Sequence, residues 1–129
     1  MIGSIGPRVL AATLPHVDSW NTWHAWFGNT PRGFVDLNAT IDEAARAVGR
    51  DPAEVARTAA LYWQFEGGGG RRQGDTDRHT ADPQAGSPDE LAEALRAYAD
   101  AGVSHLQLVL DPITIRSVEL AGRALELLG

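Results

Sequence analysis

Residues 87–110, SPDELAEALRAYADAGVSHLQLVL, contain a complete helix pattern followed by a complete buried-strand pattern. Ser87 and Glu90 have the spacing of a capping box, and Pro88 stands at the first helical position, so a helix is expected to start here. Apolar residues then recur at helical spacing until a glycine ends the pattern. Residues 103–110 are short and apolar. The stretch therefore predicts a helix that leads into a buried strand.

The same alternation extends along the rest of the chain. Strands are predicted at 2–5, 19–23, 55–65 and 103–110, and helices at 7–17, 40–49, 88–101 and 112–128. Thr40 and Glu43 form a second apparent capping box. For residues 55–65, a buried helix is the alternative to the predicted strand. Alternation of this kind implies an α/β fold with a parallel sheet and right-handed crossovers. Four units are half of a (β/α)₈ TIM-type barrel of roughly 250 residues, and an open flavodoxin-like sheet also fits.

The chain is expected to form a single half-barrel domain over residues 1–129. Residues 28–33 have a composition typical of a loop, because Gly, Asn and Pro lie close together. Residues 67–86 begin with four glycines, continue with charged side chains and show no periodic pattern. We predict a mobile loop there, either a lid or a disordered segment.

Composition excludes several classes of function. The net charge is −6, and all positive side chains are Arg spread along the chain, which argues against a nucleic-acid-binding face. There is no cysteine, so disulfides and thiolate metal sites are excluded and a reducing cytoplasm fits. No apolar run is long enough to span a membrane, and no signal peptide is apparent. Hydrophobic residues, at 43%, are numerous enough to build a core.

Five short segments, in this order and spacing, resemble the luciferase-like monooxygenase family of flavin- or deazaflavin-dependent oxidoreductases. They are IGSIGPR at 2–8, VDSWNT at 17–22, VGRDP at 48–52, GSPDE at 86–90 and AGVSHLQL at 101–108. The resemblance covers most of the chain and implies barrel units five to eight, the C-terminal half, with units one to four absent.

The resemblance also implies a cofactor and a reaction. The cofactor is FMN or an 8-hydroxy-5-deazaflavin coenzyme, and the reaction is hydride transfer or oxygen activation on a small organic substrate. Without an N-terminal half, the chain is expected to be inactive. Two alternatives remain open at this point. One is a non-catalytic half barrel that forms a homo-oligomer or pairs with a separate N-terminal half, and the other is an open-sheet module that binds a phosphate ligand.

A turn with two glycines near the N-terminus is the candidate cofactor site. Gly3, Ser4 and Gly6 precede a predicted helix, and backbone amides at such a position can bind an anion. Arg8 adds a positive charge. The resemblance implies that this turn holds the cofactor phosphate. The alternative interpretation is an ordinary connection between a strand and a helix.

An aromatic and polar run follows at the end of the second predicted strand. Trp20, Asn21, Thr22 and Trp23 are the candidate substrate pocket, because the carboxyl ends of barrel strands carry the active site. Core packing is the alternative for Trp20. His24 is a weak candidate for a hydrogen-bond donor or catalytic base.

The remaining polar residues favour structural roles. Glu66 is expected to be a solvated loop carboxylate, and Asp111 the N-cap of the last helix. The pair at 71 and 72 is expected to be solvated, with contact to a phosphate tail as the alternative. No metal site is predicted, because His16, His79 and His105 lack partners at metal-ligand spacing.

Overall fold

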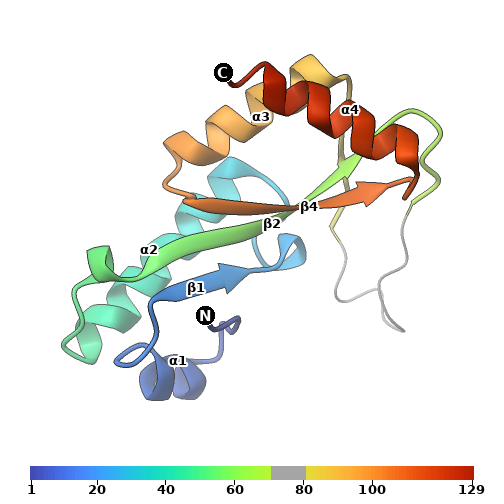
Figure 1. The fold of residues 1–129 in the computed structure, drawn as a ribbon. Helices are drawn as coiled ribbons and strands as arrows, with labels where there is room; N and C mark the ends of the chain where they lie inside the picture. Colours follow the sequence, from blue (N-terminus) through green and yellow to red (C-terminus); the bar gives the residue numbers. More distant parts are fainter. Residues whose placement is uncertain (71–80) are drawn as a thin grey trace.

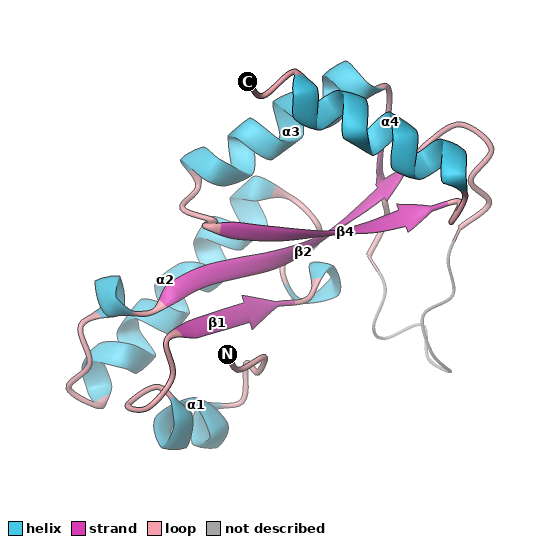
Figure 2. Cartoon of the chain, in the orientation of Figure 1, coloured by secondary structure: helices cyan, strands magenta, loops and turns pink. Residues whose placement is uncertain are grey.

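A computed structural model describes residues 1–70 and 81–129 (Figure 1). Helices and strands alternate along it, as the sequence predicts (Figure 2). The elements are α1 (Pro7–Thr13), β1 (Ser19–Thr22), α2 (Pro31–Ala47), β2 (Ala56–Gln64), β3 (Gln84–Ala85), α3 (Pro88–Asp100), β4 (His105–Asp111) and α4 (Ile115–Glu126), with 3₁₀ turns at His24–Trp26 and Pro52–Glu54. None of the described helices is long and apolar enough to cross a membrane.

All strand pairs in the sheet are parallel, and the long strands follow one another in sequence order. Ile2 forms a bridge to β1, β1 pairs with β2, and β2 pairs with β4 over residues 58–64. A doubly wound sheet would reverse its strand order, whereas sequential order with right-handed crossovers places every helix on one face. The fold is therefore four units of a (β/α)₈ barrel and not an open flavodoxin-like sheet.

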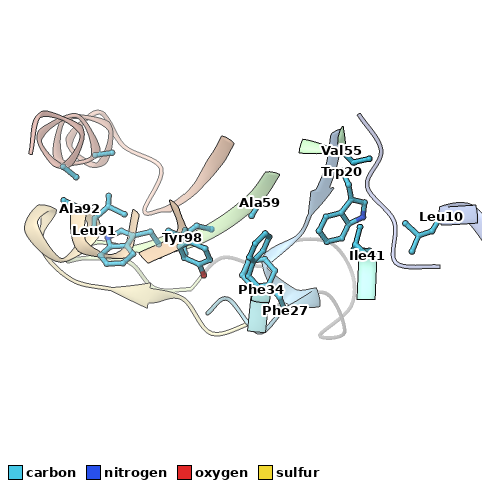
Figure 3. Close-up of a cluster of buried hydrophobic side chains, with 14 of the residues drawn as sticks. Leu10, Trp20, Phe27, Phe34, Ile41, Val55, Ala59, Leu91, Ala92 and Tyr98 are labelled. Carbon is cyan, nitrogen blue, oxygen red and sulfur yellow. The ribbon is translucent and has the colours of Figure 1, made fainter. Parts of the chain in front are cut away.

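The main core lies between the sheet and the helices that cover it. Successive side chains of a strand point to opposite faces, so Ala59, Leu61 and Trp63 of β2 face the helices together. They pack with Phe34 of α2 and Tyr98 of α3, both fully buried, within the cluster shown in Figure 3. Each large apolar side chain buried here contributes about 1.5–3 kcal/mol.

Asn29 completes one edge of β2 in place of a strand. Its amide Nδ2 donates to the carbonyl of Tyr62 at 2.8 Å and to that of Asp82 at 3.0 Å, and its Oδ1 accepts from the amide of Tyr62 at 2.9 Å. Gln84 Nε2 donates to the Asn29 carbonyl at 2.6 Å. The Asn29 side chain therefore fills the gap along β2 between β1, which pairs with residues 56–59, and β3, which pairs with residues 63 and 64.

The helix predicted to start at Thr40 starts earlier, because α2 begins at Pro31. Thr30 is the N-cap, its hydroxyl accepting from the Gly33 amide at 3.0 Å, and Pro31 opens the helix. A side chain on Gly33 would place its Cβ only 1.8 Å from the carbonyl oxygen of Phe27. Gly33 is thus required by close packing within a helix, although its composition suggested a loop. The apparent capping box at 40–43 lies in the middle of α2.

Two other local predictions have definite outcomes. The capping box at Ser87 is confirmed, with both reciprocal hydrogen bonds present. The segment predicted as a loop at 67–86 contains β3, which pairs with the end of β2, so its C-terminal part belongs to the sheet. Residues 71–80, including Arg71, Arg72 and His79, lie outside the described part.

Arg57 ties α2 to the amino end of β2. Its guanidinium is 6% exposed and donates to Asn38 Oδ1 at 2.6 Å, to the Val55 carbonyl at 2.5 Å and to Asp42 Oδ1 at 2.5 Å. A buried cation needs such partners, because its desolvation is otherwise costly. In a barrel, this end of the strands serves stability rather than chemistry.

Replacing Asn29 by Ala should lower the free energy of unfolding by about 3 kcal/mol, because it leaves buried backbone groups without partners. Urea denaturation measures the change. Asn29→Gly, which tolerates the positive φ of 57°, separates the lost hydrogen bonds from backbone strain. Thr40→Ala on the exposed side of α2 is the control for removal of a polar side chain, and it should change stability by less than about 0.5 kcal/mol. An equal effect at both positions would refute the bridging role.

Asp42→Ala should destabilise the protein by about 2 kcal/mol, because it leaves the Arg57 cation partly uncompensated. The control is Asp36→Ala, which removes an exposed ion pair to Arg32 with an N–O distance of 3.7 Å. Such a pair is worth less than about 1 kcal/mol. Thermal or urea unfolding of both variants compares them, and similar losses would contradict the structural role of Arg57.

Candidate functional site

The carboxyl ends of the parallel strands meet at one edge of the sheet, which in a (β/α)₈ barrel carries the active site. Four features of the described chain lie at this edge. They are the turn at residues 3–6, Trp23 and His24 after β1, residues 65–68 after β2, and Asp111 at the end of β4.

The N-terminal turn is held against β1. Ser4 Oγ accepts a hydrogen bond from the Gly6 amide at 3.1 Å, and the Ser4 carbonyl accepts from Trp20 Nε1 at 2.7 Å. Gly6 precedes α1 and gives it no side-chain cap. Because α1 has only seven residues, its dipole adds little here, and the local positive charge comes from the exposed Arg8.

The predicted substrate pocket divides between the two faces of the sheet. Trp20 and Thr22 are both fully buried, on the side of β1 that faces the helices, so they pack in the core. Asn21 lies on the opposite, inner face, where its Oδ1 accepts from Thr58 Oγ1 at 2.6 Å. Trp23 is half-buried and packs on the inner face with Tyr62. The two-residue period of the strand explains this division.

His24 lies between two aromatic rings. Its ring centroid is 4.3 Å from that of Trp23 and 5.2 Å from that of Tyr62. The imidazole is fully buried, neither ring nitrogen has a hydrogen-bond partner in the described part of the chain, and burial lowers the pKa from 6.5 to about 4. A side chain in this state is neutral at physiological pH and does not reach the surface, so this arrangement gives His24 a packing role.

Asp111 is a buried carboxylate at the same edge, and sequence reasoning missed it. The sequence predicts that it caps α4, but Thr114 caps that helix through the Ser117 amide. Asp111 instead ends β4 at 6% exposure, and its Oδ2 accepts from Gln64 Nε2 and from the Gly70 amide, both at 2.8 Å. The Tyr62 hydroxyl is 3.5 Å away. The sequence signal for this role is a carboxylate directly after an apolar strand.

A pocket of about 700 Å³ opens beside Gln64, one of the hydrogen-bond partners of Asp111. The end of β2, the turn before α3 and the first turns of α4 line it, and the lining side chains include Gln64, Glu66, Arg116 and Leu120. Glu66 is exposed, as the sequence predicts for a loop carboxylate. The predicted residues at 3–8 and 20–24 do not line it, so the structure separates this pocket from the turn and the aromatic wall.

Within residues 1–70 and 81–129, no three His, Cys, Asp or Glu side chains are placed to hold a metal ion. His16 and His105 are both exposed.

No protein-family model and no curated protein matches the sequence. Solved structures do match the fold. An F420-dependent secondary alcohol dehydrogenase in complex with an F420-acetone adduct superposes with a TM-score of 0.66 at 14% identity, over 98% of this chain and 48% of that chain. The coenzyme F420-dependent tetrahydromethanopterin reductase from Methanopyrus kandleri gives 0.61 at 18% identity, over 93% and 48%. This chain thus spans about half the length of these enzymes, which confirms the predicted half barrel.

Acidification should destabilise the protein through His24. Its pKa is about 4 when folded and 6.5 when exposed, so the unfolded state binds the proton first. The contribution of the neutral His24 to the free energy of unfolding is fully present above pH 6.5. It is lost as the pH drops towards 4, by about 3 kcal/mol at most. His24→Phe should remove this component from urea denaturation curves measured across the range. The exposed His105→Phe is the control, and identical pH profiles for His24→Phe and the wild type would contradict the assignment.

Proposed function

We propose that this chain is half of a deazaflavin-dependent oxidoreductase of the luciferase-like type, which transfers hydride to or from a small organic substrate. The observation that carries the proposal is the match of nearly the whole chain to one half of two enzymes named for coenzyme F420, a deazaflavin. The five sequence segments that resemble the luciferase-like family support it independently. We place the activity in the cytoplasm, which suits a chain without cysteine.

The turn at residues 3–6 suits the phosphate of such a cofactor. Gly3 and Gly6 leave the backbone accessible, because a Cβ on either would meet its nearest neighbour only at 3.5 Å or beyond. Ser4 uses an oxygen lone pair for Gly6, so its hydroxyl proton remains available to an anion. Arg8 is exposed and can form a charge-assisted hydrogen bond.

The inner face of the sheet suits the cofactor ring and the substrate. Asn21 and Trp23 are partly exposed on this face beside the buried Tyr62, and Gln64, at the carboxyl end of β2, donates to Asp111. When bound, a deazaflavin supplies the hydride chemistry, while these side chains supply orientation and exclude water. Four units enclose only half of a barrel interior, so we expect activity to require the other half.

A non-catalytic, self-associating half barrel is the second candidate. The apolar residues exposed on α4 favour it, because they are in contact with water in a monomer and would be buried by association. FMN and a monooxygenase reaction find less support, since both matching enzymes are named for F420. A phosphate-binding open sheet lacks support, because the strand order is that of a barrel.

Titration of a deazaflavin coenzyme into the protein should change the coenzyme fluorescence, either for this chain alone or after addition of a complementary four-unit half. Arg8→Ala should weaken binding about tenfold through the loss of one charged hydrogen bond. Arg32→Ala, an exposed cation on α2, should leave the affinity unchanged. The absence of any fluorescence change in both preparations would rule out the proposal.

A further inference from the structure

The pocket beside Gln64 lies between the carboxyl end of β2 and the helices α3 and α4, which pack against each other on one face of the sheet (Figure 1). Its volume of about 700 Å³ is in the range of small-molecule sites. Neither the turn at residues 3–6 nor the aromatic run at residues 20–24 lines it. The cofactor contacts proposed above therefore leave this pocket without an assigned ligand.

Two side chains of opposite charge line the pocket without pairing. Glu66 follows β2 and Arg116 belongs to the first turn of α4, and both side chains are exposed. Within residues 1–70 and 81–129, neither forms an ion pair with the other or with a third residue. The nearby Glu90 carboxylate accepts from the Ser87 amide at 2.7 Å, so it is engaged in the cap of α3. A ligand with one negative and one positive group would complement both free charges.

Helix stability does not explain the position of Arg116. The first turn of a helix is the positive end of its dipole, where a cation is less favourable than an acidic residue. The first turn of α4 has no acidic side chain, and its N-cap is the neutral Thr114. A residue that departs from such a local rule is expected at a functional site. The guanidinium is also suited to a carboxylate, which it can bind through two parallel hydrogen bonds.

Gln64 adds a neutral acceptor at the end of β2. Its Nε2 donates to Asp111 Oδ2 at 2.8 Å, and the same oxygen accepts from the Gly70 amide at 2.8 Å. Because a carboxylate only accepts, Asp111 fixes which way the Gln64 amide is turned and leaves its Oε1 as an acceptor. Gln64 and Glu66 both line the pocket from the end of β2, whereas Arg116 lines it from α4. An ammonium group, with three donors, matches the two acceptors of the first wall.

We propose that this pocket binds a free amino acid, with the carboxylate of the ligand on Arg116 and its ammonium group on Glu66 and on Gln64 Oε1. Leu120 of α4 adds apolar lining for an aliphatic ligand side chain. A simple anion would leave the Glu66 charge without a partner, and a simple amine would leave Arg116 without one. The site is separate from the turn at residues 3–6, so the proposal does not depend on deazaflavin binding.

Titration of L-leucine into the full chain, followed by ligand-observed NMR, should show saturable binding. N-acetyl-L-leucine lacks the ammonium group, and L-leucine amide lacks the carboxylate. Each should bind about fivefold more weakly, which is the effect of losing one solvent-accessible charge pair. Absence of saturation by L-leucine, or equal affinity for all three compounds, would overturn the proposal.

Charge-removing variants assign each contact. Glu66→Gln should weaken the binding of L-leucine about fivefold and leave that of N-acetyl-L-leucine unchanged, because both changes remove the same pair. Arg116→Gln should do the same for L-leucine and L-leucine amide. The controls are Glu93→Gln on α3 and Arg123→Gln in the last turn of α4, both exposed and outside the pocket, and they should bind L-leucine as the wild type does.

Urea denaturation separates binding from folding. Arg116→Gln should not lower the denaturation midpoint, because it removes a cation from the positive end of α4, whereas Arg123→Gln should lower it slightly at the opposite end. A lower midpoint for Arg116→Gln would give this side chain a structural role and contradict the proposal. Loss of L-leucine binding in the control variants would contradict it as well.

Discussion

The backbone of β2 forms hydrogen bonds along both of its edges, and the position of every other strand follows from one edge or the other. β4 occupies one edge over residues 58–64, while β1, the Asn29 amide and β3 share the opposite edge in succession. Buried backbone groups without partners are costly, so a nine-residue central strand demands such continuous pairing. The helices then pack on one face, because each crossover between these ordered strands has the same hand.

This arrangement gives the sheet two unlike faces, and the candidate site lies on one of them. The helix-facing side is apolar, and it takes Trp20 and Thr22 out of reach of any ligand. On the inner side, Asn21 accepts a hydrogen bond from Thr58, and Asp111 accepts from Gln64 and from the Gly70 amide. A polar inner face at the carboxyl ends of the strands is where a barrel enzyme binds its cofactor and substrate.

Local chemistry explains which parts of the fold were predictable. The start of α3 depends on Ser87, Pro88 and Glu90, which are close in sequence and contact one another in the folded chain. The start of α2 was misplaced because Gly33 has the composition of a loop, whereas its role depends on contact with the Phe27 carbonyl. Asp111 has the local pattern of a helix cap, but its partners Gln64 and Gly70 come from distant parts of the chain.

The sequence by itself determined the alternation of strands and helices, because periodicity and capping are properties of neighbouring residues. It also identified the turn at residues 3–6 and the aromatic run at residues 20–23 as candidate site residues at the ends of predicted strands. Only the tertiary structure decided between a half barrel and an open sheet, since strand order depends on pairing between distant segments. It also decided that Trp20 packs in the core while Asn21 and Trp23 lie on the inner face of the sheet. Only the folded chain shows that Asn29 and Asp111 accept hydrogen bonds from residues of β2. Those outcomes follow from hydrogen bonds between groups that only the folded sheet brings into register.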